Sequence, residues 1–181
     1  MKISTKQIAL AGILAAITAV LSAIGVGFIP IPSLAGAATI LHVPVIVAGA
    51  LSGVLVGGLT GFIFGFFSFV QFGSIVGNNP VVLFLPRILI GVFSALVFKA
   101  LAKKNLYLAA AVAGIVGTLT NTVGVLGFAV AFGYFTPQAA LGIVIANLPL
   151  ELLLGTILSA LIIPPIYKVL IKKESSENKE A

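Results

Sequence analysis

Long apolar segments separated by short polar breaks dominate the pattern of hydrophobic positions along this chain. The apolar residues run for about 20 positions at a time, which is the length of helix that crosses the hydrocarbon core of a bilayer. The breaks carry prolines, glycines, asparagines or paired lysines, which end helices or form turns. The pattern therefore predicts an all-α integral membrane protein, folded as a compact bundle of six transmembrane helices.

The breaks give approximate boundaries for the spans, and the boundary between the second and third is the least distinct. Pro30 and Pro32 end the first span and begin a short outer loop, and residues 73–80 form another loop rich in turn formers. Pro164 and Pro165 are expected to kink or locally unwind the last span. The expected spans cover residues 6–27, 39–52, 54–72, 80–102, 106–131 and 139–170.

The spans are close together in the sequence, and we expect one domain. Residues 1–171 form this six-helix transmembrane domain, and the polar residues 172–181 are expected to be a disordered cytoplasmic tail. The first apolar run lacks a convincing polar cleavage region and is followed by more apolar runs. We therefore interpret it as a retained span and not as a signal peptide.

The lysines indicate which way the bundle faces. Six spans put both ends of the chain on one side of the membrane, and the loops expected on the other side contain no lysine or arginine. By the positive-inside rule, both termini are therefore expected in the cytoplasm. The lysines that fall on this face are Lys2, Lys6, Lys99, Lys103, Lys104, Lys168, Lys172 and Lys173.

Composition agrees with a protein covered by lipid and excludes several other classes. The chain is 60% hydrophobic and 8% charged, whereas soluble domains have about a quarter of their residues charged. The net charge of +6 collects at the helix ends, so topology explains it better than binding to nucleic acid. The chain has no cysteine, one histidine and no GxxxxGK[ST] loop, so we expect no disulfide, metal site, cofactor, ATP site or catalytic group.

Strongly polar side chains in the membrane gather in its outer half. An ionisable group in hydrocarbon is costly unless it is paired or lines a cavity, so each is a candidate functional residue. At ~1.5 Å per residue, Arg87 lies roughly 10 Å and Glu151 roughly 20 Å from the outer face. The spacing predicts a substrate pocket open to the outside, with these candidates: Arg87, Asn121, Glu151, Asn147, Gln71, Asn79 and His42.

Each candidate also has a structural interpretation, which the sequence leaves open. Arg87 and Glu151 suit an ion pair between two spans, and Arg87 also suits bidentate binding of an anionic group of the substrate; the two roles are compatible. Asn121 lies among threonines and equally suits hydrogen bonding between helices. His42 stands where a helix begins and suits a capping or interfacial role, and Asn79 suits a turn.

Small residues at four-residue spacing predict close helix contacts at two places. In the third span they indicate packing against another helix in lipid, and not a phosphate-binding loop: Gly57, Gly61 and Gly65. In the first span they form a smooth face that either packs within the bundle or docks to a separate membrane subunit: Ala11, Ala15, Ala19 and Ala23.

Several of these features occur together in one known family. They are the six-span plan, the alanine face of the first span, the segments ATILHVPVIVAG at residues 38–49 and GFIFG at 61–65, and LPRILIG at 85–91. In this combination nearly the whole chain resembles the substrate-binding S components of energy-coupling factor (ECF) vitamin transporters. The resemblance implies high-affinity capture of a vitamin from outside, in the plasma membrane of a bacterium. It also implies a transmembrane coupling subunit and two ATPase subunits as partners, with the coupling subunit contacting Ala11, Ala15 and Ala19.

The resemblance favours pantothenate among the vitamins. Pro86 and Arg87 at the start of the fourth span look most like pantothenate-type members. A ring-free ligand with a carboxylate and hydroxyl groups suits an arginine surrounded by Asn and Gln, and the chain has no Trp to stack a flat ring. Folate, pyridoxine and cobalamin remain alternatives, as do a self-sufficient secondary transporter and a membrane-embedded enzyme.

Overall fold

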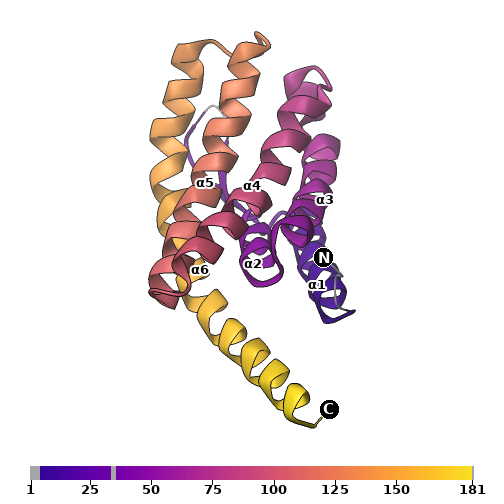
Figure 1. Ribbon diagram of the computed structural model, residues 1–181. Helices are drawn as coiled ribbons and strands as arrows, with labels where there is room; N and C mark the ends of the chain where they lie inside the picture. Colours follow the sequence, from indigo (N-terminus) through magenta and orange to yellow (C-terminus); the bar gives the residue numbers. More distant parts are fainter. Residues whose placement is uncertain (1–4, 34–35, 181) are drawn as a thin grey trace.

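The computed structural model describes residues 5–33 and 36–180, and in these the chain forms six α-helices and one β-hairpin. Figure 1 shows α3 and α4 running side by side as one pair and α5 and α6 as another, with α2 low between the pairs. The elements are α1 (Thr5–Ala23), β1 (Phe28–Pro30), β2 (Ala37–Thr39), α2 (Val43–Ser52), α3 (Val54–Phe72), the 3-10 helix η1 (Gly73–Val76), α4 (Pro80–Leu101), α5 (Leu106–Ala131) and α6 (Pro137–Glu180).

Four helices, α3, α4, α5 and α6, are long and apolar enough to cross a membrane. α1 has 19 residues, which lies at the lower end of the ~17–25 that a crossing requires. α2 has only 10 residues, or ~15 Å, which is about half the hydrocarbon thickness. The prediction that residues 39–52 form a full span is therefore wrong, because α2 is a short helix buried in the core that contacts every other helix.

The hairpin and α2 together lead the chain back from the end of α1 to the start of α3. The Gln7 side chain, near the start of α1, donates to the Ser52 carbonyl at the end of α2 (3.5 Å). At its other end, α1 meets the end of α3, where Gln71 Nε2 donates to the Ser22 carbonyl (2.7 Å). α1 and α3 therefore run parallel, and α2 runs against both.

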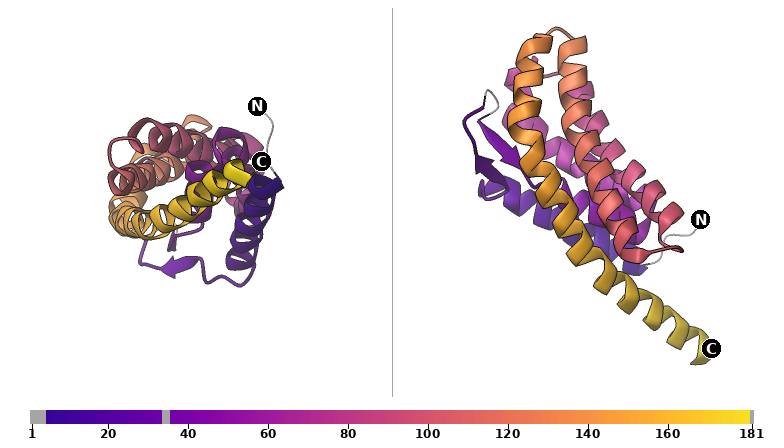
Figure 2. Two further views of the ribbon diagram at one scale, coloured as in Figure 1. Left: turned by 60° about the horizontal axis from the view of Figure 1, so that its bottom comes forward. Right: turned by 90° about the vertical axis from the view of Figure 1, so that its left-hand side faces the viewer.

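The loop predicted after the first span is a short antiparallel hairpin. Its register pairs Phe28 with Thr39, Ile29 with Ala38 and Pro30 with Ala37. Strands of three residues are too short to give a clear alternating pattern, so the sequence shows only a break at the prolines. Figure 2 (right) shows both strands lying beside the middle of α6.

Glycines bring α3 against α4 along much of their length, as the four-residue spacing predicts. A Cβ added at Gly57 would lie 2.8 Å from the Gly91 carbonyl oxygen, and one at Gly61 would lie 2.9 Å from the Ile88 Cα. A Cβ at Gly65 would lie 3.0 Å from Phe84. Because only glycine fits there, this packing fixes how α4 is rotated about its axis and so which way Arg87 faces.

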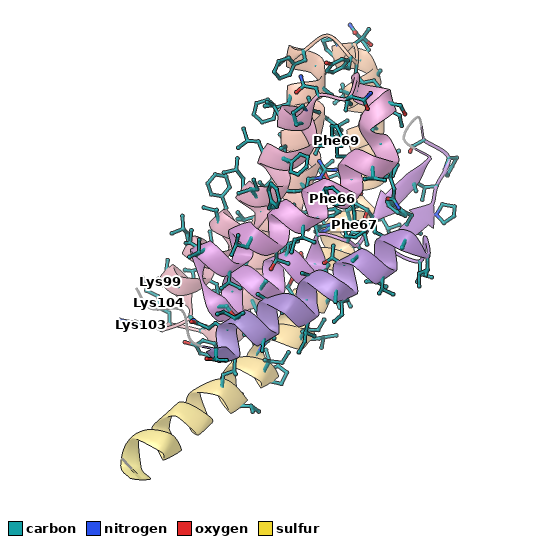
Figure 3. The ribbon with its side chains drawn as sticks, turned by 90° about the vertical axis from the view of Figure 1, so that its right-hand side faces the viewer. Phe66, Phe67, Phe69, Lys99, Lys103 and Lys104 are labelled. Carbon is teal, nitrogen blue, oxygen red and sulfur yellow. The ribbon has the colours of Figure 1, made fainter. Side chains whose placement is uncertain are left out.

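Lysines collect at one end of the bundle, which we call the lysine end: Lys99, Lys103, Lys104 and Lys168. Figure 3 shows the first three together near the place where the last part of α6 leaves the bundle. Lys168 lies there as well, with its Nζ 5.2 Å from the centre of the Tyr107 ring at the start of α5. We call the opposite end, formed by η1 and residues 132–136, the loop end.

α6 continues well past the bundle. It remains helical across Pro164 and Pro165 and through the segment predicted to be disordered, as far as Glu180. Figure 1 shows this last part projecting away from the other helices. Lysine and glutamate are frequent in this segment and have high helix propensity, so a helix that is already formed can extend through it.

Candidate functional site

A cavity of about 480 Å³ lies toward the loop end, between the hairpin and helices α3, α4, α5 and α6. Its size is within the ~300–1,000 Å³ typical of small-molecule pockets. Most of its wall is apolar, with a small group of polar side chains. The lining residues are Phe28, Ala37, Thr39, Phe64, Ser68, Phe72, Ile75, Val76, Leu83, Arg87, Asn121, Thr122, Val125, Leu126, Phe135, Ile143, Asn147 and Glu151.

Arg87 brings an unpaired positive charge into this cavity. It follows Pro86 in α4 and is 7% exposed, yet its Nε and Nη1 have no hydrogen-bond partner. Its guanidinium carbon lies 5.3 Å from the centre of the Phe64 ring, a cation–π contact. Within the described part of the chain, Arg87 forms no ion pair with Glu151, so the structural pairing left open by the sequence is not formed.

The Glu151 carboxylate is engaged on both oxygens. Oε1 accepts from the Thr39 backbone N–H (2.9 Å), and Oε2 accepts from the Thr122 hydroxyl (2.6 Å). Glu151 therefore ties α6 to α5 and to the edge of β2. These bonds stabilise a buried carboxylate and hold the hairpin against the cavity.

Asn147 and Asn121 add amide groups to the wall. Asn147 lies one turn before Glu151 on α6 and donates from Nδ2 to the Ala37 carbonyl of β2 (2.7 Å). Its Oδ1 and the Oδ1 of Asn121 are buried without a partner. The cavity thus offers free donors on Arg87 and free acceptors on the two asparagines.

Aromatic and aliphatic side chains form the rest of the wall. Phe28 and Phe72 meet edge to face at 5.4 Å between ring centres. Of the six phenylalanines of α3, Phe64 and Phe72 line the cavity, whereas Phe62 and Phe66 are half-exposed on the outside of the bundle. Figure 3 shows Phe66, Phe67 and Phe69 along α3. The cavity therefore suits a ligand with an apolar part and a few polar groups.

Two loops cover the cavity at the loop end. Ile75 and Val76 of η1 line it from one side, and Phe135 lines it from the turn between α5 and α6. The loops touch where Gly77 packs on the Tyr134 ring. Gly77 has φ +58°, and a Cβ there would lie 2.7 Å from that ring, so both backbone conformation and close approach require glycine.

Four of the seven predicted pocket residues line this cavity, and three do not. Arg87, Asn121, Asn147 and Glu151 are brought together by three helices. The others lie elsewhere and have structural contacts, as the following bonds show: His42 Nε2 to Thr118 Oγ1 at 2.9 Å in the core, Gln71 to Ser22 on α1, and Asn79 Oδ1 to the Val81 N–H as the cap of α4.

The alanine face of α1 turns partly into the bundle. Ala15 is 6% exposed, and Ala11 and Ala19 are partly buried. Ala15 therefore packs inside the bundle, the alternative that the sequence left open, and is not available to a partner subunit. The small residues that are exposed on α1 include Ala9, Gly12, Ala16 and Ala23, the last of which belongs to the predicted alanine face.

Thr39 and Thr122 are site residues that the sequence analysis missed. Thr122 follows Asn121 directly, so its position beside a candidate was an available signal. Thr39 gave no such signal, because its partner Glu151 is 112 residues away in the sequence.

Comparison with known proteins gives two matches. Residues 6–167 match the family model described as "ECF transporter, substrate-specific component". The chain is also similar to the pantothenic acid transporter PanT of Lactococcus lactis subsp. cremoris. The two are 30% identical over 155 residues, covering 72% of this chain and 78% of that protein.

Proposed function

The chain belongs to the family of ECF transporter substrate-specific components, and from this premise we propose that it captures pantothenate from outside the cell. The family works in vitamin uptake, and its members are transport subunits and not enzymes. Pantothenate is the ligand named for the similar lactococcal protein. We propose that the 480 Å³ cavity is where this chain binds it.

The observation that carries this proposal is the free guanidinium of Arg87. Two of its buried N–H groups lack a partner, and a buried charge is retained only where something compensates it. A carboxylate matches the planar donor pair of an arginine and supplies the opposite charge. Pantothenate carries one carboxylate, so we assign this group to Arg87.

The rest of the cavity also suits this ligand. Pantothenate has two hydroxyl groups, one amide and a pair of methyl groups, and no ring. The free amide oxygens of Asn121 and Asn147 accept from its donors. The apolar wall that includes Phe64 and Leu126 suits the methyl groups.

The orientation follows from the lysines. We propose that the lysine end faces the cytoplasm, by the positive-inside rule, so that the cavity lies toward the outside, beneath the two loops of the loop end. A transmembrane coupling subunit and two ATPase subunits then supply the energy for import. This arrangement agrees with a chain that carries a ligand cavity and no phosphate-binding loop.

Two measurements test the proposal. The chain is purified in mild detergent, and the small molecule that co-purifies is identified by mass spectrometry, with titration calorimetry against pantothenate as the quantitative check. Recovery of folate, pyridoxine or cobalamin, with no heat of binding for pantothenate, would contradict the ligand assignment.

Transport is measured in liposomes with and without the coupling and ATPase subunits. We expect accumulation only when these subunits and ATP are present. Accumulation by the chain alone without ATP would indicate a self-sufficient secondary transporter instead.

A further inference from the structure

The side-chain amide of Asn147 uses its nitrogen in a hydrogen bond, and its oxygen has no partner. Its Nδ2 donates to the Ala37 carbonyl at 2.7 Å. Because a carbonyl oxygen can only accept, this bond fixes the amide, with its NH₂ group toward β2 and Oδ1 turned elsewhere. Oδ1 has no partner, although Asn147 is 4% exposed.

No neighbouring group explains this unpaired oxygen. Glu151, one turn away, is an acceptor and is already bonded to Thr39 and Thr122. Arg87 is a donor on the same cavity, but its free N–H groups do not reach the amide. Unpaired buried polar atoms are rare in folded proteins and usually mark a position where a partner is absent.

The cavity therefore has free donors at one place and a free acceptor of fixed orientation at another. We propose that Asn147 is a specificity-determining residue, whose Oδ1 accepts a hydrogen bond from a hydroxyl or amide N–H group of the captured solute. This inference rests on the proposed function, in which Arg87 holds the anionic end of the same ligand. A ligand that has a carboxylate but no such donor can occupy the cavity, but it leaves Oδ1 of Asn147 without a partner.

The same amide connects the ligand to the hairpin. A donor on Oδ1 polarises the amide and strengthens its bond to Ala37. In an antiparallel pair, the backbone N–H and C=O groups of alternate residues face the partner strand, and those of the residues between face away from it. Ala37 and Thr39 of β2 are two positions apart, so the backbone groups of both face α6. Two short strands alone are marginally stable, so a ligand bound to Asn147 holds the hairpin more firmly over the cavity.

The test compares three compounds on the full chain by titration calorimetry. They are pantothenate, an analogue with both hydroxyl groups replaced by hydrogen, and an analogue with the amide nitrogen methylated. Each analogue lacks one class of donor. We expect the wild type to prefer pantothenate over at least one analogue by roughly 10- to 100-fold, the range for leaving one buried polar atom unpaired.

The diagnostic variant is Asn147→Leu, which has a similar size and no acceptor. It is expected to bind pantothenate roughly 10- to 100-fold more weakly and to lose the preference over that analogue. Asn147→Ala gives the same comparison if the leucine variant does not fold. The control is Thr60→Val, which removes a buried hydroxyl that bonds the Val56 carbonyl within α3, away from the cavity lining, and keeps the Asn147 amide. It is expected to shift all three affinities by one common factor.

The possible failures are distinguishable. If the Asn147 variants weaken all three compounds equally, or keep the wild-type preference, the assignment of Asn147 is overturned and the proposed function stands. If the wild type binds none of the three compounds, both the ligand and the assignment of Asn147 are overturned.

Discussion

Replacing Arg87 by methionine is expected to weaken ligand binding much more than it destabilises the empty protein. The guanidinium is buried with two unpaired N–H groups and has no ion-pair partner among the described residues. Burying such a charge lowers the stability of the folded protein. Replacement of a complete buried ion pair by apolar side chains of similar size is often neutral or stabilising by about 1–4 kcal/mol, and we expect the same direction for a charge without an ion-pair partner.

Two interactions oppose this gain in stability. The first is the electrostatic attraction between the guanidinium and the Glu151 carboxylate, which lines the same cavity. Methionine also loses the cation–π contact with Phe64, in which the guanidinium lies 5.3 Å from the ring centre; such contacts contribute about 0.5–2 kcal/mol. The unfolding free energy of the ligand-free protein is therefore expected to change by between about −1 and +3 kcal/mol. Ligand binding is expected to weaken by about 2–5 kcal/mol, because the carboxylate loses its counter-charge. This corresponds to a roughly 30- to 5,000-fold higher Kd.

The assay combines calorimetric titration with thermal unfolding of the ligand-free protein in the same detergent. Lys99→Met is the matched control, because it removes a cation from the same helix at the exposed lysine end. This control is expected to leave both quantities unchanged. A lower unfolding temperature for Arg87→Met, with unchanged affinity, would refute the reasoning and make Arg87 a structural residue.

Three further predictions concern packing and the hairpin. Gly91→Ala is expected to destabilise the protein by about 1–3 kcal/mol through overpacking, whereas Gly142→Ala, with open space around it, is expected to stabilise its helix by about 0.5–1 kcal/mol; equal unfolding temperatures would contradict this. Thr122→Val leaves Oε2 of the buried Glu151 carboxylate without its donor, so we expect the free energy of unfolding to fall by about 1–3 kcal/mol. Because Glu151 also bonds Thr39 of β2, we expect faster hydrogen exchange in the hairpin. Unchanged exchange would contradict the link between Glu151 and the hairpin. Ala15→Leu is expected to lower thermal stability, because Ala15 is buried, and Ala16→Leu to leave it unchanged; the reverse order in thermal unfolding would place the faces of α1 the other way round.

Helix boundaries could be predicted closely, even at the boundary that the sequence pattern shows least distinctly. The division between α2 and α3 falls at Gly53, as predicted, because its φ of +87° is a conformation that glycine adopts readily. The full span assigned to residues 39–52 was wrong because only Val43–Ser52 is helical, and Thr39 belongs to the strand that pairs with β1. That pairing depends on a partner strand and leaves no helical or alternating pattern in so short a segment.

The candidate site could be predicted in part, for a physical reason. The cost of polar groups in hydrocarbon made Arg87, Asn121, Asn147 and Glu151 candidates, and these four line one cavity. The same rule also selected His42, which is equally buried but bonds to Thr118 in the core. The free-energy cost of burying a polar group shows that the group needs a hydrogen-bond or charge partner. It does not show whether that partner is another residue or a ligand.

By itself, the sequence determined that the chain is a helical membrane protein with its lysines at one end, because apolar run length and charge placement are local properties. Only the tertiary structure decided which polar groups meet. The rotation of each helix is set by packing, such as that of Gly61 on the backbone beside Arg87, and not by its own sequence. For the same reason, contacts between segments far apart, such as Asn147 with Ala37, 110 residues away, appear only when the helices and the hairpin are assembled.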